Sequence, residues 1–400
     1  MDDAARQQFR DLLAAVVPAN PFYAAKFAGL KSLAFESLPF TTKAEIVADQ
    51  AAHPPYGTNR TFPRERYARL HQTSGSTTGH PLRWLDTLDD WDAILGCWRT
   101  IFGMVGLTRR DVLVFPFSFG PFLGFWSAFE AASRAGYLSL PAGGMTTTAR
   151  LRYLLEHAAT VVFATPTYAL HMAEVAGREG IDLPASPARC LLLAGEPGGS
   201  IPATRTMIET AWGARVFDHY GMTETGPVAV ETLDAPGSLA VLAANYVAEV
   251  VEADGTPTPH GSAGELVLTT LTRPGAPLIR YRTGDLVRAS GNVRFDGGIL
   301  GRIDDMLHIR GNNLYPTAIE AIVRRFPAVA EFRIVVDRSE ALADLHIDIE
   351  AAPGAEAESV AECVARALRD ELLFRVEVRA VPAGSLPRYE MKARRVVQRT

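Results

Sequence analysis

Short apolar segments alternate with helical patterns between Leu70 and about Pro227, and this alternation is the strongest constraint on the fold. The apolar segments are DVLVFPF, TVVFAT and CLLLAGE, and the helical patterns include ARLRYLLEHA and TYALHMAEVA. Strand, helix and strand at this spacing indicate crossover units, which connect parallel strands. The sequence therefore predicts an α/β fold whose main sheet is largely parallel.

The chain changes character twice after this region. From Tyr246 the apolar runs shorten and turn residues separate them, as in GELVLTTL and NVRFDGG, which is typical of antiparallel strands in a small β subdomain. Near Gly301 a third pattern begins with YPTAIEAIVRRF, a helix opened by proline, and continues with two strands, a helix around Val364 and a last strand. We expect a large N-terminal domain over residues 1–302 and a small α+β domain over residues 303–400.

Two helices are expected ahead of the alternating region. FRDLLAAVV is amphipathic. In LPFTTKAEI, either Thr41 or Thr42 can cap a helix whose first turn carries Glu45.

Composition excludes several classes of protein. Of the 400 residues, 48% are apolar and 21% charged, so the chain is neither disordered nor collagen-like. The net charge of −5 leaves no global basic field for nucleic acid, although a local anion site stays open. The three cysteines lack metal-binding spacing, and no apolar run approaches the roughly 18 residues that span a bilayer. We expect a cytoplasmic protein without nucleic-acid or membrane partners.

The segment HQTSGSTTGHP, residues 71–81, sets two glycines among hydroxyl residues. Such a loop can turn backbone N–H groups and hydroxyls toward phosphate oxygens. It differs from the phosphate loop of kinase-like or motor-like ATPases because no lysine follows Gly79. A polar surface turn is the alternative interpretation.

Two further segments carry polar residues where strands end. LLLAGEPGG, residues 191–199, ends a buried strand, and open α/β sheets hold ligands at such ends. VFDHYGMTETG, residues 216–226, offers an aromatic face for a base, a hydroxyl for phosphate and a carboxylate that suits magnesium. The alternatives are a helix-starting turn in the first segment, and a core aromatic with a solvated charge in the second.

Three features in the C-terminal third complete the set. In RYRTGD, Asp285 can accept from both ribose hydroxyls, with a type I turn as the alternative. The paired Asp304 and Asp305 suit a hinge, although charged linkers are common. Lysine is rare in this arginine-rich chain and occurs only at Lys26, Lys31, Lys43 and Lys392. A compact ammonium differs from a guanidinium in reach and geometry, so Lys392 indicates a specific role, with a basic tail as the alternative.

Taken together, the order and spacing of these segments resemble the adenylate-forming acyl and aryl ligases, most closely the phenylacetate-coenzyme A ligase group. The resemblance runs from about Leu38 to the end, and LPFTTKAEI, DHYG and RIDDMLHIRGNNLYPTAIE carry it most strongly. It implies that a carboxylate attacks the α-phosphorus of ATP to give an acyl-adenylate and pyrophosphate, after which a thiol displaces AMP. It also implies ATP, Mg²⁺ and coenzyme A as cofactors.

The resemblance also implies a role for each site residue. Lys392 would bridge the substrate carboxylate and the adenylate, Thr223 would hold the α-phosphate, and Glu224 would ligate Mg²⁺. The nucleotide-binding residues would be Ser74, Gly75, Ser76, Thr77, Thr78 and Gly79 on the β- and γ-phosphates, Gly195, Glu196 and Pro197 beside the adenine, Asp218, His219, Tyr220 and Gly221 around it with Tyr220 stacked and Asp218 accepting from the amino group, and Asp285 on the ribose with Arg302 nearby. In the second half-reaction the small domain would rotate at Asp304, and the loop around Arg310 and Gly311 would replace Lys392.

The acid and the acyl acceptor are less constrained. The aromatic segment FPFSFGPFLGFW, residues 115–126, predicts a flat apolar pocket for an aryl or arylacetic acid, with core packing as the alternative. The chain departs from the family pattern at His80, where lysine is usual, and at Met391, where glycine is usual.

Three functions stay open. An acid:coenzyme A ligase is favoured. An adenylating enzyme that passes its acyl group to a carrier-protein thiol or an amine is the first alternative. A non-catalytic nucleotide or acid sensor is disfavoured, because sensing needs neither a metal carboxylate nor a transition-state cation. The expected partners are a small carboxylic acid with coenzyme A or a carrier protein, and a homodimer is the default oligomer.

Overall fold

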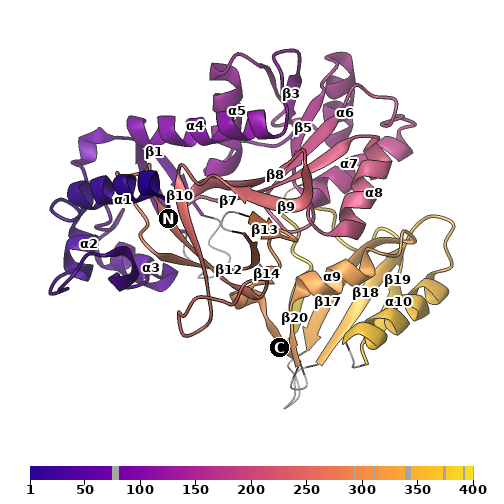
Figure 1. The fold of residues 1–400 in the computed structure, drawn as a ribbon. Helices are drawn as coiled ribbons and strands as arrows, with labels where there is room; N and C mark the ends of the chain where they lie inside the picture. The colour runs from indigo at the N-terminus through magenta and orange to yellow at the C-terminus, as the bar shows by residue number, and fades with distance from the viewer. Residues whose placement is uncertain are drawn as a thin grey trace.

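A helical N-terminal segment, a large mixed sheet and a small C-terminal α+β unit follow one another along the chain (Figure 1). The computed structural model describes residues 1–73, 81–291, 294–309, 312–337, 344–372, 375–390 and 392–399.

The N-terminal segment consists of α1 (Asp3–Val16), α2 (Pro21–Lys26), η1 (Phe35–Ser37), α3 (Lys43–Ala52) and η2 (Arg64–Arg66). The helix predicted around Glu45 is confirmed as α3. Its cap is Thr42, whose hydroxyl accepts from the Glu45 N–H at 3.3 Å while the Glu45 carboxylate accepts from the Thr42 N–H at 2.7 Å. This reciprocal pair is a capping box, which satisfies two backbone donors at the helix start.

The predicted parallel strands are present. They are β3 (Val112–Phe115), β4 (Leu138–Pro141), β5 (Val161–Ala164), β6 (Cys190–Leu193) and β7 (Arg215–Met222), paired in the order β4-β3-β5-β6-β7. The connecting helices are α4 (Leu88–Met104), α5 (Leu123–Arg134), α6 (Thr147–Glu156), α7 (Pro166–Arg178) and α8 (Pro202–Trp212).

Both faces of this parallel sheet are buried. Along β6, Leu192 belongs to the core shared with α4 and α5, whereas Leu191 and Leu193 belong to the core shared with α6, α7 and α8. Successive side chains of a strand point to opposite faces, so an apolar run without polar alternation is what a sheet covered on both sides requires.

Antiparallel strands extend the same sheet beyond β7, and they include the strands predicted after Tyr246 together with two that precede it and were not predicted. The strands are β8 (Gly226–Thr232), β9 (Ala235–Val241), β10 (Tyr246–Val251), β11 (Ala263–Thr270), β12 (Tyr281–Ser290), β13 (Arg294–Asp296) and β14 (Gly301–Arg302). Their order from β7 outward is β8-β9-β13-β12-β11-β10, with β14 paired to β12. A separate hairpin joins β1 (Tyr67–Gln72) and β2 (Arg83–Thr87).

The C-terminal unit begins after η3 (Ile303–Asp305). Its elements are β15 (Leu307–Ile309), β16 (Asn312–Leu314), α9 (Pro316–Val323), β17 (Val329–Asp337), β18 (Asp344–Ala351), α10 (Ala357–Leu372), β19 (Glu377–Val381) and β20 (Val396–Arg399). The sheet order is β19-β18-β17-β20, and α9 and α10 bury Ile319, Val364 and Leu368 against it. The predicted helix around Val364 is therefore confirmed.

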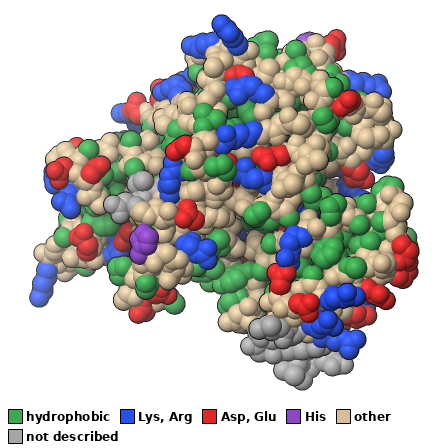
Figure 2. All heavy atoms as spheres, turned by 45° about the vertical axis from the view of Figure 1, so that its right-hand side comes forward, with side chains coloured by type: hydrophobic (Ala, Val, Ile, Leu, Met, Phe, Trp, Pro, Cys, Tyr) green, Lys and Arg blue, Asp and Glu red, His purple; other side chains and the backbone are tan. Residues whose placement is uncertain are grey.

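The surface carries charges of both signs. Acidic and basic side chains are interspersed on the face drawn in Figure 2. Within the described part of the chain, no helix combines the length and apolar character that a membrane crossing requires.

Leu192 tests the two-sided core beneath the site. The Leu192→Ala variant removes a side chain that is 1% exposed at the centre of the sheet. We expect the free energy of unfolding to fall by about 2–5 kcal/mol, because the change leaves a cavity in a close-packed core. Chemical denaturation followed by circular dichroism measures the loss. The matched control is Leu138→Ala on β4, whose side chain is 59% exposed. Equal losses in the two variants would contradict the burial pattern.

Candidate active site

Tyr220 and Asp285 meet where β7 and β12 bring them together. The Tyr220 hydroxyl donates to Asp285 Oδ2 at 2.6 Å, and Arg302 Nη1 lies 3.4 Å from Asp285 Oδ1. Burial raises the pKa of Asp285, although Arg302 and the Tyr220 hydroxyl oppose that rise. Asp285 lies within β12, so the type I turn considered for RYRTGD is not what forms. The Asp285 carboxylate therefore has two donors, Tyr220 and Arg302, in a buried position.

The Asp218 carboxylate is buried against Ser200, the His219 backbone and Gly199. The Ser200 hydroxyl donates to its Oδ2 at 2.5 Å, and its Oδ1 accepts from the His219 N–H at 3.0 Å. A Cβ added to Gly199 would lie 2.7 Å from the Asp218 carboxyl carbon, so only glycine fits beside it. Burial raises the pKa of Asp218 to about 6, against the lowering effect of the Ser200 hydrogen bond.

Lys392 reaches the end of β6 from the C-terminal unit. Its Cε lies 3.5 Å from the position that a Cβ on Gly195 would occupy, and Gly195 itself has φ +100°. The Lys392 side chain retains solvent access, yet the protein atoms around it lower its pKa by burial, while Glu196 and Asp285 act in the opposite direction. The single lysine of the C-terminal third is therefore set among carboxylates at the sheet end rather than in a basic tail.

Glu196 joins the two units next to Lys392. Its Oε2 accepts from the backbone N–H of Ala393 at 2.7 Å, and its Oε1 accepts from the N–H of Thr167 at the start of α7 at 2.8 Å. Two further ion pairs hold the same C-terminal segment to the large unit: Arg150 with Glu390 at 3.1 Å, and Arg388 with Glu174 at 3.1 Å.

Thr223 and Glu224 form the turn between β7 and β8, and a buried arginine fixes that turn. Arg273 Nη1 donates to the carbonyl oxygens of Thr223 at 3.2 Å and Glu224 at 2.8 Å, while its Nε donates to Asp86 at 2.5 Å. The Glu224 residue is 5% exposed, so it is not a solvated charge. Lys43 Nζ lies 3.8 Å from Glu224 Oε1.

His219 and Gly221 serve the packing around these groups. The His219 imidazole stacks on Trp98 with ring centroids 4.6 Å apart, and burial lowers its pKa to about 3. A Cβ on Gly221 would lie 2.7 Å from the Gly226 carbonyl oxygen, so glycine allows the two strands to approach. His219 therefore packs against Trp98 of α4.

The structure describes only some of the remaining predicted site residues. Pro197 follows Glu196 and is partly buried. The predicted phosphate-binding residues Ser74, Gly75, Ser76, Thr77, Thr78 and Gly79, and the predicted loop residues Arg310 and Gly311, lie outside the described residues. In the aromatic segment, Phe115 and Phe117 are core residues at 0% and 3% exposure, so core packing accounts for them.

Among the described residues, no group of three or more His, Cys, Asp or Glu side chains is arranged to hold a metal ion. A single buried carboxylate such as Glu224 still fits Mg²⁺, which is commonly held by one or two carboxylates together with substrate phosphates.

Sequence reasoning missed three residues of the site. Ser200 and Arg273 gave no signal, because each acts through a partner far away in the sequence, Asp218 and Asp86 respectively. Lys43 did carry a signal, since it is one of only four lysines in the chain.

The raised pKa of Asp218 predicts a pH-dependent stability. The pKa of this carboxyl is about 6 in the folded state and has its ordinary value of 3.8 in the unfolded state, so between these pH values the folded state binds more protons. Stability therefore falls as pH rises through this window. The Asp218→Asn variant removes the titration, and we expect it to gain up to about 3 kcal/mol relative to the parent between pH 4 and pH 7.

Urea denaturation at several pH values measures this difference. Asp89→Asn on α4, where the carboxylate is 84% exposed, is the matched control. A stability difference between Asp218→Asn and the parent that stays constant with pH would show that Asp218 does not titrate in this way.

Comparison with known proteins covers both units of the chain. The family described as AMP-binding enzyme matches residues 37–271, and the family described as AMP-binding enzyme C-terminal domain matches residues 311–400. A phenylacetate-coenzyme A ligase of Aromatoleum evansii is 32% identical over 339 residues, which cover 82% of this chain and 74% of the relative.

Two solved structures of 2-hydroxyisobutyryl-CoA ligase are also similar. Its postadenylation state in complex with R3-HIB-AMP gives a TM-score of 0.92 at 30% identity, over 100% of this chain and 89% of that one. Its thioesterification state, in complex with 2-HIB-AMP and CoA, gives a TM-score of 0.73 at 30% identity, over 99% and 89% of the two chains. The chain therefore belongs to the AMP-binding, adenylate-forming enzyme family and is similar to phenylacetate-coenzyme A ligases.

Proposed function

We propose that this protein activates a carboxylic acid with ATP through an acyl-adenylate and then transfers the acyl group to the thiol of coenzyme A. The observation that carries the proposal is the position of Lys392. The Lys392 side chain of the C-terminal unit lies over Gly195, and its ammonium feels the charges of Glu196, Asp285 and Glu224. We propose that a phosphate ester and a carboxylate share this ammonium.

In the first half-reaction, an oxygen of the substrate carboxylate bonds to the α-phosphorus while the bond to the bridging oxygen of pyrophosphate breaks. Such a transition state spreads negative charge over oxygens, so positioning and charge neutralisation dominate the catalysis. Lys392 supplies a cation beside both reacting anions, and Thr223 offers a hydroxyl to the α-phosphate. Asp285 accepts from the ribose, and Tyr220 covers the adenine with its ring.

Mg²⁺ belongs to this proposal as the metal that would accompany ATP. Glu224 would hold it together with phosphate oxygens, and when bound it would neutralise charge on the polyphosphate. The two carbonyl hydrogen bonds from Arg273 keep the Glu224 turn in place without occupying its carboxylate.

In the second half-reaction, the coenzyme A sulfur bonds to the acyl carbon and AMP leaves. The proposal includes a domain boundary at residues 302 and 303 and a rotation at Asp304 that withdraws Lys392. The arrangement described here suits the first step, and its greater similarity to the postadenylation state of 2-hydroxyisobutyryl-CoA ligase supports that assignment. The contacts of Glu196 with Ala393 and of Arg388 with Glu174 would break on rotation.

The substrate class that we propose is an aryl or arylacetic acid. Similarity to a phenylacetate-coenzyme A ligase supports this class. Phe119 and Trp126 are partly buried against the core of the large unit, with ring centroids 4.7 Å apart, and so leave aromatic surface that a ligand could contact.

An acid panel tests the activity itself. We expect ATP–pyrophosphate exchange with arylacetic or benzoic acids, followed by thioester formation when coenzyme A is added. Pyrophosphate exchange without thioester formation, and with acyl product only on a carrier protein or an amine, would show that coenzyme A is not the acyl acceptor. Nucleotide binding without exchange on any acid would make the protein a sensor.

The Lys392→Ala variant separates the two half-reactions. We expect pyrophosphate exchange to fall at least about 100-fold, because a charge-assisted contact made in the transition state is lost. Thiolysis of a supplied acyl-adenylate should be retained, since Lys392 has left the site in that step. Arg394→Ala, in the same segment and exposed, is the matched control. Equal loss of both steps in Lys392→Ala would argue against alternation of the two units.

A further inference from the structure

The backbone around Lys392 is attached to the large unit at several points. Before the lysine, Arg388 pairs with Glu174 and Glu390 pairs with Arg150, each at 3.1 Å. The Glu174 and Glu390 side chains are 39% and 56% exposed, so solvent screens these pairs, and the side chains that make them are long and adaptable. They join the two units but fix the position of the lysine only loosely.

Glu196 makes a closer contact, through the backbone of the residue after the lysine. Its Oε2 accepts from the Ala393 N–H at 2.7 Å. The peptide group that carries this N–H is planar and includes the Cα atom of Lys392, so the hydrogen bond fixes where the lysine side chain starts. Burial lowers the pKa of Lys392, and the charge of Glu196 is the largest influence in the opposite direction. Glu196 therefore acts on both the position and the charge of Lys392.

The other oxygen of the same carboxylate binds the start of a helix in the large unit. Glu196 Oε1 accepts from the Thr167 N–H at 2.8 Å, and Thr167 is the second residue of α7 and only 6% exposed. N–H groups in the first turn of a helix have no acceptor within the helix, and a carboxylate is favoured there. One side chain thus links a buried helix start directly to the peptide group of the lysine.

Thr167 gives the segment a second fixed point. Its hydroxyl accepts from Arg395 Nη2 at 3.3 Å, and Arg395 Nε donates to Glu331 Oε1 at 2.8 Å in the C-terminal unit. Ala393 and Arg395 are therefore both held to the start of α7, the first through Glu196 and the second through the Thr167 hydroxyl.

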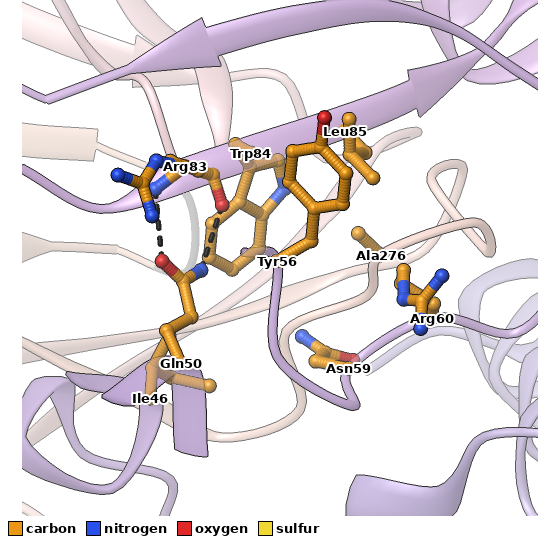
Figure 3. Close-up of a pocket in the computed structure, with 9 residues that line it drawn as sticks. All are labelled: Ile46, Gln50, Tyr56, Asn59, Arg60, Arg83, Trp84, Leu85 and Ala276. Atoms are coloured by element: carbon orange, nitrogen blue, oxygen red, sulfur yellow. Dashed lines mark hydrogen bonds between the residues drawn. The ribbon is translucent and has the colours of Figure 1, made fainter. Parts of the chain in front are cut away.

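A carboxylate suits the position of Glu196 because two donors face it. Elsewhere in the chain, Gln50 shows what an amide does: it donates to the Arg83 carbonyl oxygen at 2.7 Å and accepts from the Arg83 N–H at 3.0 Å, as the dashed lines in Figure 3 show. An amide matches one donor and one acceptor, since it has a single acceptor oxygen. In a Glu196→Gln variant, either the Thr167 N–H or the Ala393 N–H would lose its acceptor.

We propose that Glu196 is a positioning residue for the first half-reaction, which holds Lys392 where the α-phosphate and the substrate carboxylate meet. Its side chain then serves the lysine rather than the adenine, although Glu196 stands in the segment expected to border the adenine. The inference rests on the proposed function for the role of Lys392, but the contact itself can be tested without a substrate.

The Glu196→Gln variant tests the role in catalysis, because it keeps the shape of the side chain and removes one acceptor. We expect kcat of ATP–pyrophosphate exchange to fall about 10- to 100-fold, since a small displacement of a reacting group costs this much. The KM for ATP and the dissociation constant for AMP should change less than about threefold. Weakened AMP binding with little loss of kcat would assign the side chain to the adenine and overturn the proposal.

A double-mutant cycle with Lys392→Ala shows whether Glu196 acts through the lysine. We expect Glu196→Gln to lower exchange no further once Lys392 is replaced, because both changes then remove the same contribution. Thiolysis of a supplied acyl-adenylate should be retained in Glu196→Gln. Losses that multiply in the double variant would overturn the proposal.

Glu174→Gln is the matched control. It breaks the pair with Arg388 between the same two units and leaves the neighbour of the lysine untouched. We expect exchange to fall less than about threefold, because a partly exposed ion pair contributes little. Equal losses in Glu174→Gln and Glu196→Gln would point to general loosening between the units and would overturn the proposal.

Amide hydrogen exchange of the full chain, followed by mass spectrometry, gives a readout that needs no activity. We expect the Ala393 amide to be protected in the parent and to exchange at least about tenfold faster in Glu196→Gln. The amide of Leu192 in β6 should stay protected in both, which reports that the variant is folded. An unprotected Ala393 amide in the parent would overturn the proposal before any variant is made.

The two proposals fail in different ways. Protection of Ala393 that depends on Glu196, with no pyrophosphate exchange by the parent on any acid, would support Glu196 as the residue that positions Lys392 and reject the ligase activity. Pyrophosphate exchange by the parent, with the same kcat in Glu196→Gln, would support the ligase activity and reject the positioning role.

Discussion

Strand β7 is the constraint on which the site depends. It pairs in parallel with β6 on one side and antiparallel with β8 on the other. The sheet therefore changes from parallel to antiparallel pairing at this strand. Parallel neighbours deliver their carboxyl ends to one edge, and the antiparallel continuation brings β12 back to that same edge. The hydrogen bond between Tyr220 and Asp285 joins β7 to β12 at this edge, although the two residues are 65 positions apart in sequence.

The C-terminal unit brings Lys392 to this edge of the sheet, and charged side chains hold the segment around it. Arg395 donates to Glu331 at 2.8 Å within its own unit and to the Thr167 hydroxyl at 3.3 Å in the large unit. Buried ion pairs offset a desolvation cost and add little net stability, but they fix one geometry among alternatives. A polar contact surface of this kind suits the rotation that we propose, whereas an apolar one would resist separation of the two units.

Two carboxylates of the site are buried, and burial disfavours their charged form. Asp218 and Asp285 both have raised pKa values because they are buried, and each keeps a hydroxyl donor as partner, Ser200 and Tyr220 respectively. Such groups cost stability in the free protein. Under the proposed function, a nucleotide that supplies donors from its base and ribose would offset part of that cost.

Sequence by itself determined the layered fold and indicated the enzyme family. The apolar runs around Leu192, the capping pattern at Thr42 and the period of the helix around Val364 are local signals, and each formed as predicted because local spacing decides which face is buried. The scarcity of lysine likewise singled out Lys392. Tertiary structure alone decided that Arg273 holds the Glu224 turn and that Lys43 reaches it. These contacts join residues 49 and 181 positions apart, and no local spacing encodes which distant side chain will satisfy a given buried group once the sheet has closed.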